Sequence, residues 1–296
     1  MKNINVDEII KHFQEKLNNG KSENLLNYLK FISNFHNYSF NNTILIYSQM
    51  PTASFCASFV NWRSKGYVVK RGEKGIRILV PKIAKFVIDD NGEKIFFSQM
   101  TQEQREKVDK YYTLTTFTEG CVFDISQTEK VKGSKEDDMF FKPLGNDFEE
   151  QYVTLKSIVE SKGIEVKEEN TGSAEGISLG GKISIKKDLD YNNKTLVLIH
   201  EFSHEILDQD IYNEVQESDR QETNSSIREL RAESCSYIVS SYLGLDNPFS
   251  ADYVLHWSNK EEFIKNLETI KKASSHIISL LEEYNTNKLD NSNVAV

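Results

Sequence analysis

Cysteine is scarce in this chain of 296 residues, which contains only Cys56, Cys121 and Cys235. The count is odd and no two cysteines lie close together, so the sequence excludes a disulfide framework and favours a reducing cytosol. The same scarcity argues against thiolates as ligands of a zinc ion.

Long apolar runs are also absent. No segment approaches the roughly 20 apolar residues that a transmembrane helix needs, and the N-terminal residues lack the apolar centre of a signal peptide. We therefore expect a cytoplasmic protein without a membrane partner. Hydrophobic residues make up 38% of the chain and aromatic residues 11%, enough to build the cores of two domains of ordinary size.

Charge is distributed unevenly along the chain, whose net charge is -9. Residues 1–125 hold 17 basic and 13 acidic side chains, whereas residues 126–296 hold 19 and 32. The stretch 61–85 alone carries eight basic residues and one acid, Glu73. Such asymmetry suggests two separate tasks, with the basic half as the candidate for binding a polyanion.

The hydrophobic pattern of the N-terminal half changes its period near Tyr67. Before that point, helical spacing predicts two helices within 6–33, a third over 41–50 and a short one over 55–64. After it, short apolar segments separated by glycine predict strands and a hairpin around Asp90-Asn91-Gly92. The expected strands lie at 67–69, 76–81, 85–89, 94–98, 111–117 and 121–124.

The C-terminal half has the pattern of a mixed helix and strand domain. We expect helices over 146–162, 195–207, 226–243 and 261–284, and strands over 164–168 and 181–186. The predicted fold class is α+β with two domains, of which the first combines helices with a small antiparallel sheet. The predicted boundaries are 1–128 and 148–285, with a charged linker over 129–147 and a disordered tail over 286–296.

The sequence His200-Glu201-Phe202-Ser203-His204 lies within the apolar run 195–207, and the chain has only six histidines. Two histidines four residues apart share one face of a helix, so both imidazoles can bind the same ion. This H-E-x-x-H spacing is typical of zinc peptidases, in which the glutamate is the general base. The alternative is a buried helix that happens to carry two surface histidines and a carboxylate.

A zinc ion bound by His200 and His204 needs a further protein ligand. The helix 226–243 resembles the gluzincin signature E-x-x-A-[D/E/N] at Glu229, Ala232 and Glu233. That resemblance implies that Glu229 binds the metal and that Glu233 supports a ligand histidine. Two alternatives remain open: the glutamates form an ordinary solvated, salt-bridged helix face, or the ligand is Glu233 or His256.

These residue types predict metal-assisted hydrolysis of a peptide bond. Zinc lowers the pKa of water at such a site toward about 7. Glu201 takes the proton as water attacks the carbonyl, then delivers it to the leaving amine. We expect the strand 181–186 to pair with the backbone of a protein substrate whose identity the sequence does not give.

Positive charge and aromatic rings occur together around the first predicted hairpin. Single-stranded nucleic acid binding uses both, through phosphate neutralisation and base stacking. The alternative is that the two rings are core residues and the cations only keep a hairpin soluble. The candidate DNA-binding residues are Trp62, Arg63, Lys65, Tyr67, Lys70, Arg71, Lys74 and Arg77.

Four segments of the N-terminal half, at 38–45 (YSFNNTIL), 59–62 (FVNW), 66–76 (GYVVKRGEKGI) and 121–128 (CVFDISQT), resemble the N-terminal domain of ArdC-type antirestriction proteins. That family, carried by conjugative plasmids and integrative elements, joins this domain to a zincin-like metallopeptidase domain. The peptidase half is also similar to the ImmA/IrrE group, through its H-E-x-x-H and E-x-x-A features. The charged stretch 134–139 matches no motif of the family.

The resemblance implies single-stranded DNA binding, one Zn²⁺ or other divalent ion per chain, and a role when a mobile element enters a new host as a single strand. Two rival interpretations remain. The first is an ImmA-type regulatory protease that cuts a repressor, with the basic half locating it on DNA. The second is a DNA-binding protein whose zincin domain is catalytically inactive.

Overall fold

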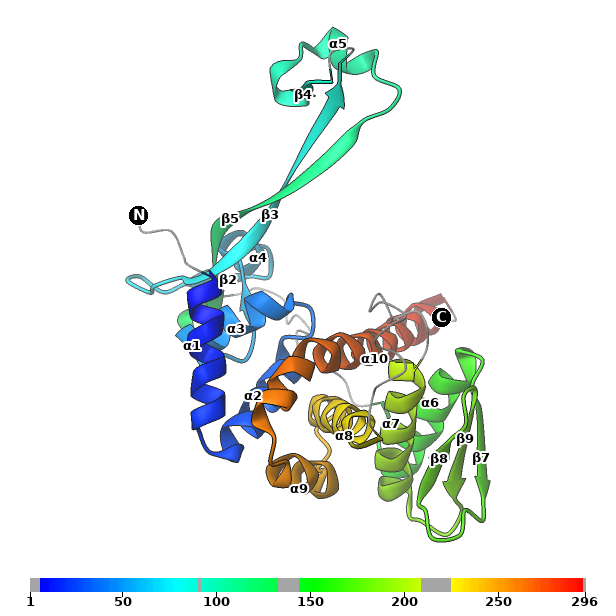
Figure 1. The fold of residues 1–296 in the computed structure, drawn as a ribbon. Coiled ribbons are helices and arrows are strands. Elements are labelled where there is room, and N and C mark those ends of the chain that lie inside the picture. The colour runs from blue at the N-terminus through cyan, green and yellow to red at the C-terminus, as the bar shows by residue number, and fades with distance from the viewer. Residues whose placement is uncertain (1–5, 90–91, 133–143, 209–224, 295–296) are drawn as a thin grey trace.

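The computed structural model describes residues 6–89, 92–132, 144–208 and 225–294. It is a mixed α and β fold in which a group of helices carries a long projecting β-ribbon and a small sheet (Figure 1). Three helices open the chain, as their apolar spacing predicts: α1 (Val6–Asn19), α2 (Ser22–Asn34) and α3 (Phe40–Gln49).

The projecting ribbon is formed by β3 (Ile76–Ile88) and β5 (Tyr112–Asp124), which pair antiparallel along most of their length. The sequence predicted two strands broken near Gly120, but β5 runs through this residue. A Cβ at Gly120 would lie 2.3 Å from Cγ2 of Val80. Glycine therefore permits the close approach of the two strands and does not break the pairing.

Short elements complete the N-terminal half. The predicted hairpin is confirmed, because β4 (Lys94–Phe96) pairs antiparallel with β3, while residues 90–91 lie outside the described part. β1 (Cys56–Ala57) pairs with β5, so the four-stranded sheet has the order β1-β5-β3-β4. The ribbon end also carries the 3₁₀ turn η1 (Phe97–Gln99) and the helix α5 (Gln102–Glu106).

The predicted helix 55–64 is shorter in the structure, where α4 spans Phe59–Ser64. Cys56–Ala57 are already paired in β1, and the Ser58 hydroxyl then caps α4 by accepting from the backbone N–H of Asn61. After the 3₁₀ turn η2 (Ile125–Gln127), β6 (Thr128–Lys130) pairs with β2 (Tyr67–Val69). The first two residues of the predicted linker therefore belong to a strand.

The C-terminal half contains α6 (Phe148–Ser161), a three-stranded sheet, and α7 (Tyr191–Asp208), α8 (Ser225–Tyr242), α9 (Pro248–His256) and α10 (Lys260–Val294). The strands β7 (Glu165–Glu169), β8 (Gly176–Ser178) and β9 (Lys182–Lys186) have the order β7-β9-β8, and β9 is the central strand. The predicted helices are confirmed. The predicted disordered tail differs from the structure, in which α10 continues to Val294.

The two halves of the described chain share one hydrophobic core. α2 packs against α8 and α9, and α10 contacts α1, α2 and α7. Buried Lys271 of α10 donates from Nζ to the backbone oxygens of Tyr38, at 2.6 Å, and His36, at 3.2 Å. The division into domains at 129–147 stays a prediction, and residues 133–143 of that linker lie outside the described part.

Among the described helices, none combines the length and apolar character that a membrane crossing would require.

Candidate metal centre and basic surface

The helix α7 positions the two histidines of the H-E-x-x-H sequence. Asp190, the residue before α7, caps the start of this helix: its Oδ1 accepts from the backbone N–H of Asn193 at 2.9 Å. Apolar side chains then fix the orientation of the helix by burying most of its surface: Leu198, Ile199 and Phe202 are fully buried. His200 and His204 lie on the remaining face, with ring centroids 4.8 Å apart.

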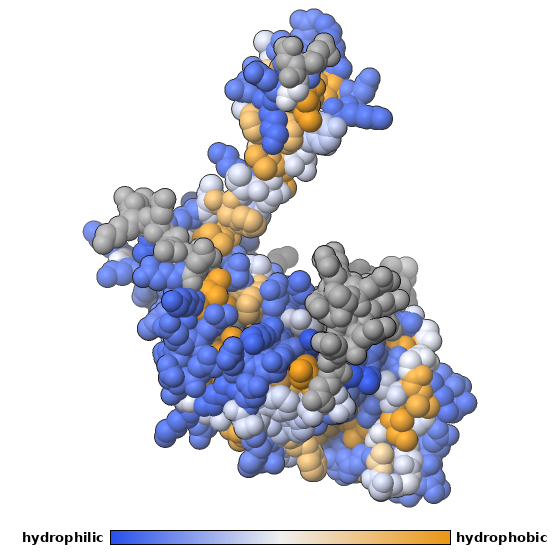
Figure 2. Space-filling view, in the orientation of Figure 1, coloured by the Kyte–Doolittle hydropathy of each residue, from blue (hydrophilic) through white to orange (hydrophobic). Residues whose placement is uncertain are grey.

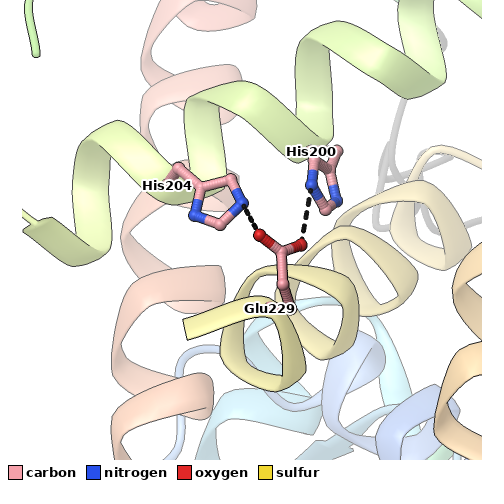
Figure 3. Close-up of side chains that lie close together, drawn as sticks. All are labelled: His200, His204 and Glu229. Atoms are coloured by element: carbon pink, nitrogen blue, oxygen red, sulfur yellow. Dashed lines mark ion pairs between the residues drawn. The ribbon is translucent and has the colours of Figure 1, made fainter. Parts of the chain in front are cut away.

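Glu229 of α8 points between the two histidines (Figure 3). Its Oε1 lies 3.4 Å from Nε2 of His204, and its Oε2 lies 3.6 Å from Nε2 of His200. One ligand atom from each of the three residues lies within 4.8 Å of the others. The donor set of two imidazoles and one carboxylate fits a divalent ion and leaves room for a fourth ligand, as in zinc sites that carry out catalysis.

Glu233, one turn further along α8, contacts the other nitrogen of His200. Its Oε2 lies 3.5 Å from Nδ1 of His200 and accepts a 2.5 Å hydrogen bond from the Ser250 hydroxyl. A carboxylate at this nitrogen orients a ligand histidine and sets its tautomer. Glu229 as ligand and Glu233 as its support stay predictions. The third candidate ligand, His256, is 76% exposed in its side chain and pairs with Asp252, outside this cluster.

Burial and charge act in opposite directions on the cluster. Burial alone would lower the pKa of His200, but the Glu233 carboxylate, helped by Glu201 and Glu229, leaves that pKa above its usual value. Burial also raises the pKa of Glu201, and the two histidines offset only part of this rise. The hydrogen bond to His204 holds the pKa of Glu229 below its usual range.

Glu201 is only 7% exposed and lies against β8. A Cβ at Gly176 would come within 2.6 Å of Oε1 of Glu201 and 2.5 Å of Cγ1 of Val197, so the strand and the helix approach closely here. Glu201 and His200 also line a cavity of about 210 Å³ between α7, α8, β8 and the start of α9. The predicted base therefore faces space that a substrate can enter.

The prediction that the strand 181–186 pairs with the substrate backbone is wrong. This segment is β9, which pairs with β7 on one side and β8 on the other, so both of its edges are occupied. β7 and β8 are the edge strands of this described sheet, and β8 is the one beside Glu201. Its three residues, Gly176–Ser178, are too few to give a periodic pattern in the sequence.

Sequence reasoning also missed Glu205, the residue after His204. This side chain is buried, and its carboxylate accepts from the Ser178 hydroxyl and from the backbone N–H groups of Gly180 and Gly181 at 2.6 to 2.9 Å. A charged residue inside an apolar helix requires such partners. That requirement was the one available signal, but it does not say where the partners lie.

In the basic half, the structure contradicts a DNA-stacking role for Trp62. The side chain is fully buried, its Nε1 donates to the backbone oxygen of Phe123 at 2.8 Å, and its ring packs against Phe55 and Tyr67. Trp62 is therefore a core residue in this conformation. Tyr67 is half-buried against it.

The predicted cations lie around α4, the turn after β2, and the start of β3. Arg63, Lys70, Arg71, Lys74 and Arg77 are exposed and Lys65 is half-buried. They surround the base of the ribbon, and Lys70 also donates to the backbone oxygen of Ser126 at 2.8 Å.

The outer ribbon differs in character from its base. Residues 80–118 contain six basic and six acidic side chains, and apolar side chains lie along the ribbon (Figure 2). Ile83 and Phe117, for example, are 64% and 63% exposed. The surface with an excess of positive charge is therefore the base of the ribbon and not its outer part.

Comparison with known families supports the assignment of the N-terminal half. Residues 3–123 match the family model of the N-terminal domain of anti-restriction factor ArdC. This part of the chain is therefore similar to that domain family. The match ends before the residues of the candidate metal centre.

One protein of Bacillus anthracis is similar to most of this chain. The chain is 26% identical over 298 residues to the uncharacterized protein pXO2-81/BXB0111/GBAA_pXO2_0111 of Bacillus anthracis, in an alignment that covers 88% of this chain and 48% of that protein. The chain thus spans about half the length of the relative it matches.

Two crystal structures of the antirestriction ArdC protein from the R388 plasmid are also similar. The metal-free structure has a TM-score of 0.46 and 17% identity, over 84% of this chain and 86% of that chain. The Mn(II)-bound structure has a TM-score of 0.46 and 16% identity, over 95% and 98%. At this level the similarity carries no argument about the fold or the metal of this protein.

Proposed function

We propose that this protein binds single-stranded DNA and hydrolyses a peptide bond in a protein substrate, in an antirestriction role when a mobile element becomes established in a host cell. The observation that carries the peptidase part is the convergence of His200, His204 and Glu229 beside Glu201. The match of residues 3–123 to the ArdC N-terminal domain supports the antirestriction and DNA-binding part.

In this proposal His200, His204 and Glu229 hold one divalent ion, with Zn²⁺ as the first candidate. The ion would polarise a carbonyl oxygen and make water a better nucleophile near neutral pH. Glu233 orients His200 through Nδ1, and the Ser250 hydroxyl holds Glu233 in place. The ligand shell is therefore supported by α9 as well as by α7 and α8.

Glu201 is the proton carrier of the proposed reaction. It accepts a proton from the attacking water and returns it to the amine that leaves. The close approach of Gly176 to the carboxylate restricts where its oxygens can lie. The edge of β8 that has no strand partner in the described sheet would hold the substrate backbone next to this carboxylate by adding it as a further strand.

A catalytic role is favoured over a purely structural metal site. A structural zinc site is usually closed by four protein ligands, whereas the cluster found among the described residues offers three. The cavity beside Glu201 also provides room for a reactant.

The decisive experiment compares the Zn²⁺-loaded full chain with its Glu201→Gln variant on a randomised peptide library, with product sequencing by mass spectrometry. New peptide ends should appear with the natural protein and fall at least a hundredfold with the variant, the usual scale for loss of a general base. Equal cleavage by both proteins would show that Glu201 is not the base. Absence of cleavage by metal-loaded protein would contradict the peptidase proposal.

A further inference from the structure

The cavity beside Glu201 is small. Its volume of about 210 Å³ is below the roughly 300–1,000 Å³ of pockets that enclose a whole small ligand. A space of this size suits one side chain of a longer molecule. It is lined by Glu175, Gly176, Leu196, Val197, His200, Glu201, Glu233, Ser236, Asn247, Phe249 and Ser250.

Three apolar side chains, those of Leu196, Val197 and Phe249, belong to the lining. Leu196 and Val197 belong to the turn of α7 that precedes His200 and Glu201. Phe249, in the first turn of α9, lines the cavity while 66% of it remains exposed, so its ring lies at the rim. An apolar side chain that entered here would bury its own surface together with that of Phe249.

The polar groups of the cavity already bond to one another. Nδ2 of Asn247 donates to Oγ of Ser236 at 3.1 Å, and Oδ1 of Asn247 accepts from the N–H of Ser250 at 3.2 Å. Glu175, Glu201 and Glu233 contribute the acidic side chains of the lining. This environment disfavours an acidic side chain, because a second negative charge would be repelled and desolvated.

The neighbouring edge strand determines how a peptide would pass the cavity. β8 pairs antiparallel with β9 along one edge, and in the described sheet its other edge is unpaired. Gly176 of β8 lines the cavity and contacts Glu201. A strand added to this edge presents alternate side chains to the same face, so one side chain next to the reacting bond would meet the cavity.

We infer that this cavity is a specificity subsite for one large apolar side chain of an extended peptide, at the residue adjacent to the bond that is cut. The inference rests on the proposed peptidase function and specifies its substrate class. Phe249 is the specificity-determining residue at the rim, and Leu196 and Val197 are the other apolar residues of the lining.

The test measures binding separately from cleavage. The Zn²⁺-loaded full chain with Glu201→Gln is titrated with fluorescent peptide pools that are randomised except for one fixed position. When the fixed position is the one whose side chain enters the cavity, pools with Leu or Phe there should bind about tenfold or more tightly than pools with Ala or Asp. This is the preference expected for filling an apolar pocket. Phe249→Ala in the same background should reduce the preference for Leu over Ala at least threefold.

Phe148→Ala is the matched control, because Phe148 is also exposed, at 51%, but begins α6 and does not line the cavity. It should leave the preference unchanged. Equal binding of all pools, no binding of any pool, or a preference that Phe249→Ala leaves intact would each overturn the subsite. If the Glu201→Gln protein shows the preference but the natural protein cleaves no peptide, the subsite is supported and the peptidase function is rejected.

Discussion

The Ser178 hydroxyl donates a 2.6 Å hydrogen bond to the carboxylate of Glu205, the residue that follows the second histidine of the metal cluster. Gly180 and Gly181 donate their N–H groups to the same carboxylate. The helix that supplies His200 and His204 is therefore tied to the turn between β8 and β9. Through this contact the position of the edge strand depends on the helix that carries the candidate metal ligands.

Loss of this carboxylate should be costly. Glu205→Ala leaves three donors without their acceptor, and each lost hydrogen bond costs about 1 kcal/mol net. We expect the free energy of unfolding to fall by about 3 kcal/mol and the amides of Gly180 and Gly181 to exchange faster with deuterium. Urea denaturation and hydrogen exchange measure both. Ser178→Ala should cost about 1 kcal/mol. An equal loss in the two variants would contradict the role of Glu205 in tying α7 to the turn between β8 and β9.

The metal ligands can be separated by substitution. We expect one Zn²⁺ per chain in the natural protein, loss of metal in His200→Ala and Glu229→Ala, and a 10- to 100-fold weaker affinity in Glu233→Ala, the usual effect of removing a group that orients a ligand. Glu201→Gln should keep the metal. Elemental analysis and competition with a chelator measure these affinities. Retention by Glu229→Ala with loss by Glu233→Ala would reverse the two roles.

Local patterns in the sequence were sufficient for much of this site. The spacing of His200 and His204 places them on one face of any helix, and the apolar run 195–207 around them predicts that helix. The partners depend on tertiary contacts that leave no periodic signal. β8 is three residues long, and Trp62 among basic residues has the same local pattern whether its ring stacks on a base or lies in the core. Only the packing against Phe55 and Tyr67 decides between the two.

DNA binding should depend on the exposed cations and not on Trp62. Arg71→Glu with Lys74→Glu in the full chain should weaken binding of a labelled single strand at least tenfold and reduce its salt dependence, because phosphate contacts release counterions. Lys265→Glu with Lys272→Glu on α10 changes the net charge equally and serves as the control. Fluorescence anisotropy at several salt concentrations gives these values. Equal weakening by both pairs would indicate that net charge alone matters, and tighter binding to duplex would reject the single-strand preference.

The contact between Lys271 and the N-terminal half should make stability depend on pH. Burial lowers the pKa of Lys271 to about 8, below its value of about 10.4 in an unfolded chain. Between these values the unfolded chain binds more protons than the folded one, so this group makes stability rise as pH increases from about 8 to about 10.4. The rise from this group is about 3 kcal/mol.

Lys271→Met removes the titrating group and keeps a long side chain. Urea denaturation between pH 8 and 10.4 should show a smaller rise in stability for this variant than for the natural protein. At pH 8 the variant also loses the hydrogen bonds to Tyr38 and His36, so its absolute stability is not the readout. The pH slope is the readout, and identical slopes for the two proteins would show that Lys271 titrates normally.

The close approach of Gly176 to Glu201 provides the sharpest test of the catalytic geometry. In Gly176→Ala the new methyl group would lie 2.6 Å from Oε1 of Glu201 and 2.5 Å from Cγ1 of Val197, so the carboxylate must move. A displacement of about 1 Å can cost about a hundredfold in rate, and we expect peptide cleavage to fall to that extent while bound Zn²⁺ remains at one per chain. Ile177→Ala alters the neighbouring residue, whose side chain points to the opposite face of β8, and should change cleavage less than threefold. Loss of metal in Gly176→Ala would mean that the strand holds the ligand cluster itself, and unchanged cleavage would mean that Glu201 need not occupy this position.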